Sequence, residues 1–402
     1  MTAGTAPRSA DRLRVAVVIT RMQAGAGVVA LRGARALDPD RYRVTLVAGS
    51  GDRLLDEAVG AGLEVVLEPS LRSPIAPLDD LRALFRLATL FRQRSFDVVH
   101  THSAKAGAIG REAARRAGVP RLVHTYHGLP FHEFQSPPRR GAYARIERRL
   151  GRFTDVGLCV GTAVSVEVVR RGLLSPERIR TIAVPVDRDA TIRSPQTRAR
   201  ARRLLGLPES GAVVGSVGRL CYQKAPEHFV AAMAALGRPE VTGVWVGGGE
   251  LAQQAAESAR RALPAARVVL VGEREDVPEL LPAFDVFALP SRYEGLPVAI
   301  CEAMVCGVPV VASAVNSVPD VVRPGETGLL APPQRPELLA AAIGHLLDRP
   351  DEASRMAAAA RARIDERYTE RALADTLTAA YGPPPARAAT ATTTEAPLHT
   401  RI

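Results

Sequence analysis

The segment SRYEGLPVAICEAM, residues 291–304, carries two carboxylates eight positions apart, Glu294 and Glu302. Pro297 suits the first position of a helix, and Gly307 suits the residue just past its end. Glu294 is therefore expected on the preceding loop, and Glu302 about one and a half turns inside the helix. Two carboxylates held in that way could bind different hydroxyl groups of one elongated polar ligand. The alternative, a pair of solvated glutamates, is disfavoured because the helix around Glu302 is otherwise apolar and an unpaired charge there would be costly.

A second group of residues could hold a diphosphate. In VGRLCYQK, residues 217–224, Gly218 and Arg219 end an apolar run, and Lys224 follows five residues later. Arg219 offers a planar fork and Lys224 a compact charge, so the two could stabilise a departing diphosphate in place of a metal. Lys224 and Lys105 are the only lysines among 53 basic residues. This rarity suggests that a compact ammonium is required at both positions, with chance as the alternative.

Five of the eight histidines gather between residues 100 and 132, namely His100, His102, His124, His127 and His132. Their HxH and HxxH spacings fall on predicted strands and loops with no nearby cysteine and few acidic residues, so a metal site is disfavoured. We interpret most of them as polar lining at strand ends. His127 is the one positioned to contact a reacting group directly.

Other nucleotide-binding signatures are incomplete. The glycine-bearing turn TRMQAGAGVV, residues 20–29, lacks the GxGxxG pattern and has no suitably placed acidic residue downstream. The stretch VGGGE, residues 246–250, fails the same test, and the DxD strings at residues 38–40 and 187–189 are interpreted as turns. These patterns do not indicate a dinucleotide enzyme.

Charge and composition limit the class of partner. The chain has 402 residues and a net charge of +11, and residues 1–190 carry 30 basic against 19 acidic residues, which accounts for the whole surplus. This asymmetry indicates an anionic partner for the first half, which is nucleic acid, a phosphorylated substrate or an acidic membrane surface. Nucleic acid is disfavoured because the charge is diffuse and aromatic residues make up only 4% of the chain.

Sequence features also indicate a compartment. No apolar run reaches the ~20 residues that a membrane span needs. The first apolar run continues into the chain without a small-residue cleavage site, so we interpret it as a strand and not a signal peptide. The four cysteines have no CxxC spacing, which favours a reducing cytoplasm.

Short β-branched apolar runs, seven in the first half and six in the second, alternate with helix-like stretches. Such runs are typical of parallel, doubly wound sheets covered on both faces, and the length favours two domains. We therefore predict an α/β protein with two Rossmann-like domains. The expected segments are a disordered N-terminus at 1–10, a first domain at 11–186, a linker at 187–205, a second domain at 206–352, a helical segment at 353–382 and a disordered tail at 383–402.

The candidate residues agree with this architecture. His127, Gly218 and Glu294 each follow a predicted strand. Ligands of open parallel sheets bind at the carboxyl ends of the strands. The chemistry should therefore line the cleft between the two domains.

Taken together, these motifs resemble glycosyltransferase family 4, whose members are retaining enzymes with the two-domain GT-B fold. EGLPVAICE resembles the family's E-x7-E motif, GRLCYQK resembles its diphosphate clamp, and the glycine turn after the first strand is similar to its GGA turn. The resemblance covers nearly all of residues 12–382. It implies two facing Rossmann-like domains, with the donor bound mainly by the second and the acceptor by the first.

The resemblance implies roles for individual residues. Glu294 would face the transferred sugar, Glu302 would hold the nucleotide ribose, and His127 would lie near the reacting sugar. Arg219 and Lys224 would stabilise the diphosphate. Further donor contacts, including the base pocket at VGERED, are expected from Gly25, Gly218, Arg274, Gly295 and Leu296.

The motifs expected on the acceptor side resemble those of one subgroup of the family. HTHSAKAG and HTYHGLPFHEFQ, residues 100–107 and 124–135, look like enzymes that build bacterial exopolysaccharide or capsule repeat units on a polyprenyl diphosphate. Gly27, His102 and Lys105 would then face the acceptor, with Lys105 against its phosphate. The arginine-rich segment at 137–153 is either a membrane-interfacial helix or an ordinary solvated one. Two departures, Ala26 in the glycine turn and the apolar Val28 after it, affect this acceptor side.

The expected protein is a cytoplasmic, metal-independent, retaining glycosyltransferase without a cofactor. It would move a hexose or N-acetylhexosamine from a nucleotide diphosphate sugar, with UDP the favoured carrier, to a lipid-linked acceptor at an anionic membrane. One alternative is a glycosyltransferase that acts on a soluble natural product. The other is a GT-B-fold sugar-nucleotide epimerase, or a binder that acts on the donor alone.

Overall fold

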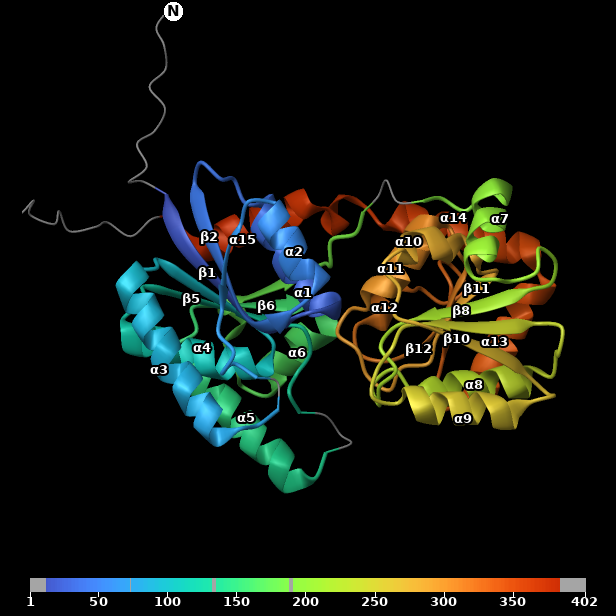
Figure 1. Ribbon diagram of the computed structural model, residues 1–402, viewed down its shortest axis with the longest axis horizontal. Helices are drawn as coiled ribbons and strands as arrows, with labels where there is room; N and C mark the ends of the chain where they lie inside the picture. Colours follow the sequence, from blue (N-terminus) through green and yellow to red (C-terminus); the bar gives the residue numbers. More distant parts are fainter. Residues whose placement is uncertain (1–11, 73, 132–134, 188–190, 384–402) are drawn as a thin grey trace, which may run out of the picture.

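The computed structural model describes residues 12–72, 74–131, 135–187 and 191–383. Within these residues the chain forms two lobes, each built on one β-sheet with helices on both faces (Figure 1). All paired strands are parallel. This confirms the predicted α/β fold of two Rossmann-like domains. The segments expected to be disordered, 1–10 and 383–402, fall outside the described residues except for Pro383.

Seven strands form the first sheet in the order β3-β2-β1-β4-β5-β6-β7. They match the seven apolar runs of the first half and are β1 (Leu13–Met22), β2 (Tyr42–Gly51), β3 (Glu64–Leu67), β4 (Val98–His102), β5 (Arg121–Tyr126), β6 (Val156–Val160) and β7 (Ile179–Ile182). In β1, Val15 and Val17 belong to one core, whereas Ala16 and Val18 belong to the core on the opposite face. Because both faces are covered, the strand is continuously apolar.

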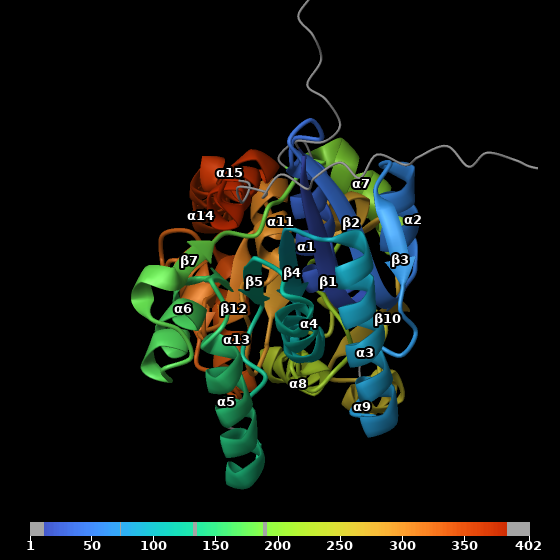
Figure 2. The ribbon, with the colours of Figure 1, turned by 90° about the vertical axis from the view of Figure 1, so that its left-hand side faces the viewer.

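The helices of the first domain divide between these two faces. The described ones are α1 (Ala24–Ala36), α2 (Arg53–Gly60), α3 (Pro77–Arg94), α4 (Ala104–Ala117), α5 (Pro137–Gly151) and α6 (Thr162–Arg170). Helices α3 and α4 pack over the face that carries Ala16 and Val18, and α5 lies beside α4 (Figure 2). Helices α1 and α2 cover the other face.

Six strands form the second sheet in the order β10-β9-β8-β11-β12-β13. They are β8 (Val213–Val217), β9 (Thr242–Val246), β10 (Arg267–Gly272), β11 (Val286–Leu289), β12 (Val310–Ser313) and β13 (Leu329–Ala331). The helices of this half are α7 (Pro195–Leu204), α8 (Pro226–Leu236), α9 (Ala252–Ala262), α10 (Val277–Leu280), α11 (Val298–Cys306), α12 (Val318–Val321), α13 (Pro336–Asp348), α14 (Pro350–Arg363) and α15 (Glu370–Tyr381).

Each sheet reverses its strand order once, between β1 and β4 in the first and between β8 and β11 in the second. At such a switch point the connections leave in opposite directions, so a crevice opens at the carboxyl ends of the two strands. The loops after β4, β8 and β11 carry His102, Gly218 and Glu294, or residues next to them. The fold therefore brings the predicted motifs to the two crevices.

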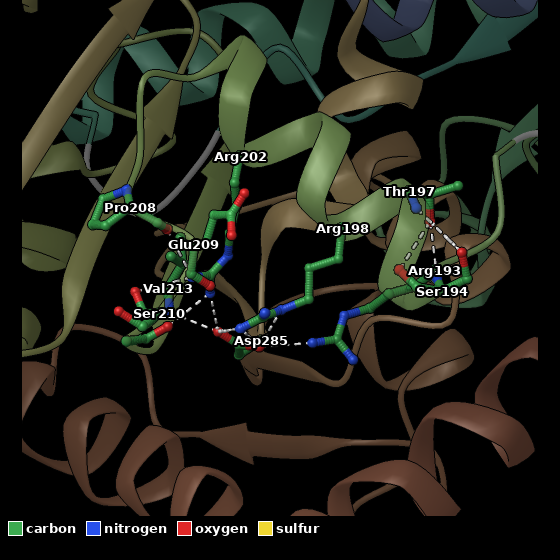
Figure 3. Close-up of polar contacts among 11 residues, drawn as sticks. Arg193, Ser194, Thr197, Arg198, Arg202, Pro208, Glu209, Ser210, Val213 and Asp285 are labelled. Atoms are coloured by element: carbon green, nitrogen blue, oxygen red, sulfur yellow. Dashed lines mark hydrogen bonds and ion pairs between the residues drawn. The ribbon is translucent and has the colours of Figure 1, made fainter.

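The chain that leaves the first domain is fixed to the second by one shared carboxylate. Asp285, at the start of β11, accepts hydrogen bonds from Arg193 at 2.6 Å, Arg198 at 3.2 Å and Arg202 at 2.9 Å (Figure 3). It also accepts one from the amide of Val213 at 2.8 Å. Arg202 is fully buried and donates to four backbone carbonyls in the following turn. A buried guanidinium with this many partners is well compensated, so α7 is held rigidly on the second domain.

The C-terminal helix returns to the first domain. Tyr381 in α15 bonds through its hydroxyl to His100 Nδ1 at 2.8 Å, and Arg121 donates to the carbonyl of Ala380 at 2.9 Å. The helical segment predicted at 353–382 is interrupted. Helix α14 ends at Arg363, a short turn follows at Glu366–Tyr368, and α15 begins at Glu370. Thr369 caps the second helix by accepting from the amide of Ala372 at 3.1 Å.

The described residues form neither a membrane-spanning helix nor a disulfide. Among these residues no helix is long and apolar enough to cross a membrane. The four cysteines, Cys159, Cys221, Cys301 and Cys306, are buried and free.

Candidate active site

Glu294 is the centre of a buried polar cluster. It lies on the loop between β11 and α11 and is 6% exposed. Its carboxylate accepts hydrogen bonds from Ser291 Oγ at 2.6 Å, Gln223 Nε2 at 3.0 Å and Lys224 Nζ at 2.6 Å. Its amide donates to Asn316 Oδ1 at 2.8 Å. A buried carboxylate would be costly without partners, and here each oxygen has at least one.

The loop that carries Glu294 meets the first domain directly. A Cβ atom added at Gly295 would lie 2.0 Å from the carbonyl oxygen of His127, so only glycine fits at this position. The structure thereby brings the predicted Glu294–Gly295 and His127 sites together across the cleft. The sequence predicted each of them at a strand end, and this contact joins the two.

The loop after β8 carries the two residues predicted to bind a diphosphate, Arg219 and Lys224, and their side chains point to different places. Lys224 is bound to Glu294, and its side chain is mostly buried. Arg219 extends outward, with its side chain 48% exposed and Glu250 3.9 Å away. The carbonyl of Gly218 accepts a hydrogen bond from Trp245 Nε1 at 2.7 Å. In this structure the two cations therefore have different partners, and a ligand would have to bridge them.

Glu302 has a very different environment. It lies in the middle of α11, where burial raises the pKa of its carboxyl and the charge of Arg32 in α1 acts in the opposite direction. In the described part of the chain no side chain is within hydrogen-bonding distance of this carboxylate. Pro297 caps α11 in place of the expected first helical position, and Gly307 ends the helix with φ +83°, as predicted.

The described histidines of this cluster are buried or half-buried, and each has a hydrogen-bond partner. His102 Nδ1 lies 2.9 Å from His127 Nε2, and His124 Nδ1 lies 2.8 Å from the hydroxyl of Thr101. Burial lowers the pKa of His127 to about 4 and that of His100 to about 3. Because a neutral imidazole carries one proton, one ring of the His102–His127 pair donates and the other accepts. His132 lies outside the described residues.

The expected acceptor-side residues divide into two groups. His102 pairs with His127 and therefore belongs to the site. Lys105, at the start of α4, instead forms an ion pair with Asp80 of α3 at 2.5 Å and donates to the carbonyl of Pro74. Gly27 packs on Leu54, where an added Cβ would lie 2.9 Å from a side-chain carbon. Lys105 thus faces α3 in this structure.

Two donor-side predictions lie at the edges of the site. Gly25 is in the first turn of α1 and not in a separate turn, and a Cβ there would lie 3.2 Å from Val298 of α11. The two helix starts therefore abut across the cleft. Arg274, after β10, is half-buried and bonds to Asp276 at 2.8 and 2.5 Å.

Sequence reasoning missed three residues that hold Glu294, namely Gln223, Ser291 and Asn316. Gln223 and Ser291 stand inside the two recognised motifs, but nothing in their spacing indicates that they converge. Asn316 has φ +42°, a left-handed conformation that asparagine tolerates better than most residues. The turn-like string AVNSVP was the one signal that could have marked it.

A cavity of about 570 Å³ opens between the domains, and neither Glu294, Lys224 nor His127 lines it. Leu296, next to Gly295, forms part of one wall, and Thr162 and Asp320 stand on opposite sides of the cleft. They are joined by a hydrogen bond of 2.5 Å from the Thr162 amide to the Asp320 carboxylate. The cleft therefore contains a cavity, and a hydrogen bond between the two domains crosses it.

Comparison with known proteins identifies two family domains. Residues 24–190 match Glycosyltransferase Family 4, and residues 197–363 match Glycosyl transferases group 1. An Escherichia coli relative, UDP-Gal:alpha-D-GlcNAc-diphosphoundecaprenol alpha-1,3-galactosyltransferase, is 30% identical over 76% of this chain and 80% of its own length. D-inositol 3-phosphate glycosyltransferase of Acidothermus cellulolyticus is 32% identical over 66% of this chain and 63% of its own.

A solved structure supports the architecture. The Anabaena protein HepE, in complex with UDP and glucose, superposes with a TM-score of 0.79 at 22% identity, covering 91% of this chain and 98% of HepE. At this identity the likeness concerns the fold. The matched domains, the E. coli relative and the two facing sheets agree that this chain belongs to the glycosyltransferases that join a family 4 domain to a group 1 domain in a GT-B fold.

Proposed function

We propose that this chain is a retaining glycosyltransferase that moves a hexose or N-acetylhexosamine from a UDP-sugar to a saccharide on a polyprenyl diphosphate, in exopolysaccharide or capsule assembly. The observation that carries the proposal is the Glu294–Lys224 pair, 2.6 Å apart, on a loop whose next residue, Gly295, lies against the His127 carbonyl of the other domain. The names of the E. coli relative and of the HepE complex support UDP and a diphosphoundecaprenol carrier.

The donor's diphosphate would replace Glu294 as the partner of Lys224. A diphosphate competes well for an ammonium because each phosphate group carries a negative charge and offers several acceptor oxygens. Arg219, on the same loop, has a half-exposed side chain 3.9 Å from Glu250. This side chain would turn toward the second phosphate. Glu294 would then accept hydrogen bonds from hydroxyl groups of the sugar. When the diphosphate replaces Glu294 on Lys224, the Glu294 carboxylate becomes available to the sugar. Donor binding would therefore prepare the sugar site.

Glu302 would receive the ribose. Its partly exposed carboxylate has unused acceptor capacity, and two adjacent hydroxyl groups can supply the donors. Placing the ribose there would also put the diphosphate near the start of α11, where free amide groups favour anions. One donor molecule would thus contact both carboxylates of the motif.

Transfer would follow a front-face course. The bond between the anomeric carbon and the diphosphate oxygen breaks, and the acceptor oxygen bonds to the same face of that carbon. The acceptor's proton passes to the departing phosphate oxygen, and UDP is released. Lys224 and Arg219 would stabilise the charge that develops on the diphosphate, so no metal is required in this scheme. His127, neutral at pH 7, would hydrogen-bond the sugar and not act as an acid.

The first experiment measures melting temperature with UDP-, GDP-, ADP- and dTDP-sugars in the presence of EDTA. A ligand that binds the folded state raises the melting temperature by mass action. We expect UDP-sugars to raise it, less so in Arg219→Gln, and equally in the control Arg261→Gln on α9. Absence of a shift with every nucleotide would contradict the donor site, and a shift that EDTA abolishes would contradict metal independence.

Acceptor and stereochemistry need a second assay. With UDP-galactose and GlcNAc-diphosphoundecaprenol we expect transfer with retention, read from the anomeric coupling constant of the product. A β-linked product from an α-linked donor would contradict the retaining course. The A. cellulolyticus relative, named for D-inositol 3-phosphate, favours a water-soluble acceptor as the second candidate. Faster transfer to a soluble acceptor than to the lipid-linked one would select it.

A further inference from the structure

Helix α3 carries large apolar side chains on its solvent side. The exposed residues on and just before it are Ile75 (70% exposed), Leu78 (74%), Leu81 (51%) and Phe85 (57%), which we name the α3 stripe. The last three are spaced by three and four residues and so share one face of the helix. The opposite face packs on the sheet through Ala83, Leu87 and Phe91. The helix is therefore apolar on both sides.

A helix on the surface of a water-soluble protein normally shows polar residues on its outer face. A contiguous row of exposed large apolar side chains typically marks an interaction site. Helix α5, at the arginine-rich segment that the sequence singled out, has only one strongly exposed large apolar residue, Ile146 at 48%. The apolar surface belongs to α3, and α5, on the other side of α4, contributes charge (Figure 2).

Arginines border the stripe. Arg82 and Arg86 alternate with its residues and have side chains 64% and 63% exposed. The guanidinium of Arg116 lies over the ring of Phe85, 5.9 Å from its centroid. Arg82 pairs with Asp79 at 3.1 Å and Arg86 with Glu68 at 3.5 Å. Both guanidinium groups are themselves exposed, and the surface pair of Arg82 is weak, so Arg82 can turn to a phosphate headgroup without a large loss. Arg86 presents its charge at the same surface while its partner Glu68 is buried.

The stripe begins beside the expected acceptor side of the cleft. Asp80, in the first turn of α3, holds Lys105 of α4 at 2.5 Å, and Lys105 follows His102 by three residues. Figure 2 shows α3 and α5 extending past the sheet in the same direction. A surface that rested on these two helices would lie at the acceptor side of the site.

We infer that the α3 stripe docks on an anionic lipid bilayer, with its apolar side chains among the acyl chains and the bordering arginines at the phosphates. The lipid nature of the acceptor rests on the proposed function, whereas the docking surface rests on the stripe alone. Apolar side chains and cations at one interface are what a bilayer with anionic headgroups complements. A second copy is a poorer occupant, because a symmetric contact would set the two arginine borders against each other.

The test is co-sedimentation of the full chain with vesicles of phosphatidylglycerol and phosphatidylethanolamine, against vesicles of phosphatidylcholine alone. We expect binding to the anionic vesicles that weakens as salt rises. The double variant Leu78→Ser/Phe85→Ser should bind at least about tenfold more weakly, because each side chain withdraws apolar area from the bilayer. The matched control, Val59→Ser/Val166→Ser, removes two equally exposed apolar side chains on α2 and α6 and should bind like the wild type.

Charge is tested in the same way. Arg82→Gln/Arg86→Gln should weaken binding, whereas Arg260→Gln/Arg261→Gln on α9 should not. Equal binding by the stripe variant and the wild type would overturn the proposal, as would wild-type chain that stays in solution. Dimerisation that the stripe variant abolishes, without vesicle binding, would assign the surface to a second copy.

The two proposals fail separately. Vesicle binding needs neither donor nor acceptor, so a chain that docks but does not respond to UDP-sugars would contradict only the proposed function. A chain that responds to UDP-sugars but ignores vesicles would contradict only the docking surface. The stripe variant should keep the wild-type melting shift with UDP-sugars, because none of its side chains lies in the donor site.

Discussion

The two glutamates of one short motif have opposite surroundings. Glu294 is held by Lys224, Gln223 and Ser291, whereas Glu302, eight residues later, is partly exposed and has no hydrogen-bond donor in the described part of the chain. The difference teaches that two carboxylates of one motif can be prepared for a ligand in different ways. One is preorganised by the protein, and the other retains acceptor capacity that a ligand can use.

The largest expected effect comes from separating the Glu294 pair. Lys224→Met leaves the Glu294 carboxylate buried without its cation, and removal of one partner of a buried pair costs about 3–5 kcal/mol. The double variant Lys224→Met/Glu294→Gln removes both charges and should recover most of that loss. Denaturant unfolding measures both. A double variant no more stable than the single one would show that the pair is not what stabilises the loop.

Activity should distinguish the two carboxylates next. Glu294→Gln should lower kcat about 100-fold or more, as expected for a group whose contacts are strongest in the transition state. Glu302→Gln should mainly raise the KM for the donor, because a ribose contact acts on ground state and transition state alike. Steady-state kinetics with varied UDP-sugar would separate these effects. A fall in kcat of equal size in both variants would remove the distinction.

Stability as a function of pH should set Glu302 apart. Its pKa is raised in the folded state, so the folded chain binds more protons than the unfolded chain between the two pKa values. Stability contributed by Glu302 is therefore lost as pH rises above the ordinary glutamate range. Glu302→Gln should stabilise the free protein by about 1 kcal/mol at pH 7. The gain should shrink as pH falls toward 4.5. A variant less stable at every pH would contradict this.

The smallest expected effect concerns the backbone of the Glu294 loop. Asn316→Gly keeps the left-handed conformation but removes the oxygen that accepts the Glu294 amide at 2.8 Å. Loss of one such bond costs about 1 kcal/mol. We expect a few-fold lower kcat with an unchanged donor KM. An unchanged kcat would mean that the side-chain partners of Glu294 position it without this bond.

The parts of the molecule that short-range pattern controls were predictable from the sequence. Strands buried on both faces must be apolar throughout, which is why the thirteen apolar runs correspond to the thirteen strands of the two sheets. Gly307 was recognisable because a helix end in the left-handed region favours glycine. The E-x7-E stretch gave Glu294 on a loop and Glu302 within a helix for the same local reasons.

Contacts between distant segments could not be predicted in this way. Lys224 and Glu294 are seventy residues apart and come together only because β8 and β11 are neighbours in the sheet. The pairing of Lys105 with Asp80 depends on the packing of α3 against α4, which no local pattern indicates. The α3 stripe was hidden because its apolar residues read like ordinary core positions until their exposure was known.

The return of α15 to the first domain has a consequence for how this chain is made. Leu373, Leu377 and Tyr381 belong to a buried core that they share with strands of the first domain, which is translated before the second. Synthesis proceeds at about 5–20 residues per second. The first domain must therefore wait for nearly the whole second domain before its own core can close. An apolar face of the nascent first domain stays uncovered during that interval, until α15, which follows the second domain in the chain, packs on it.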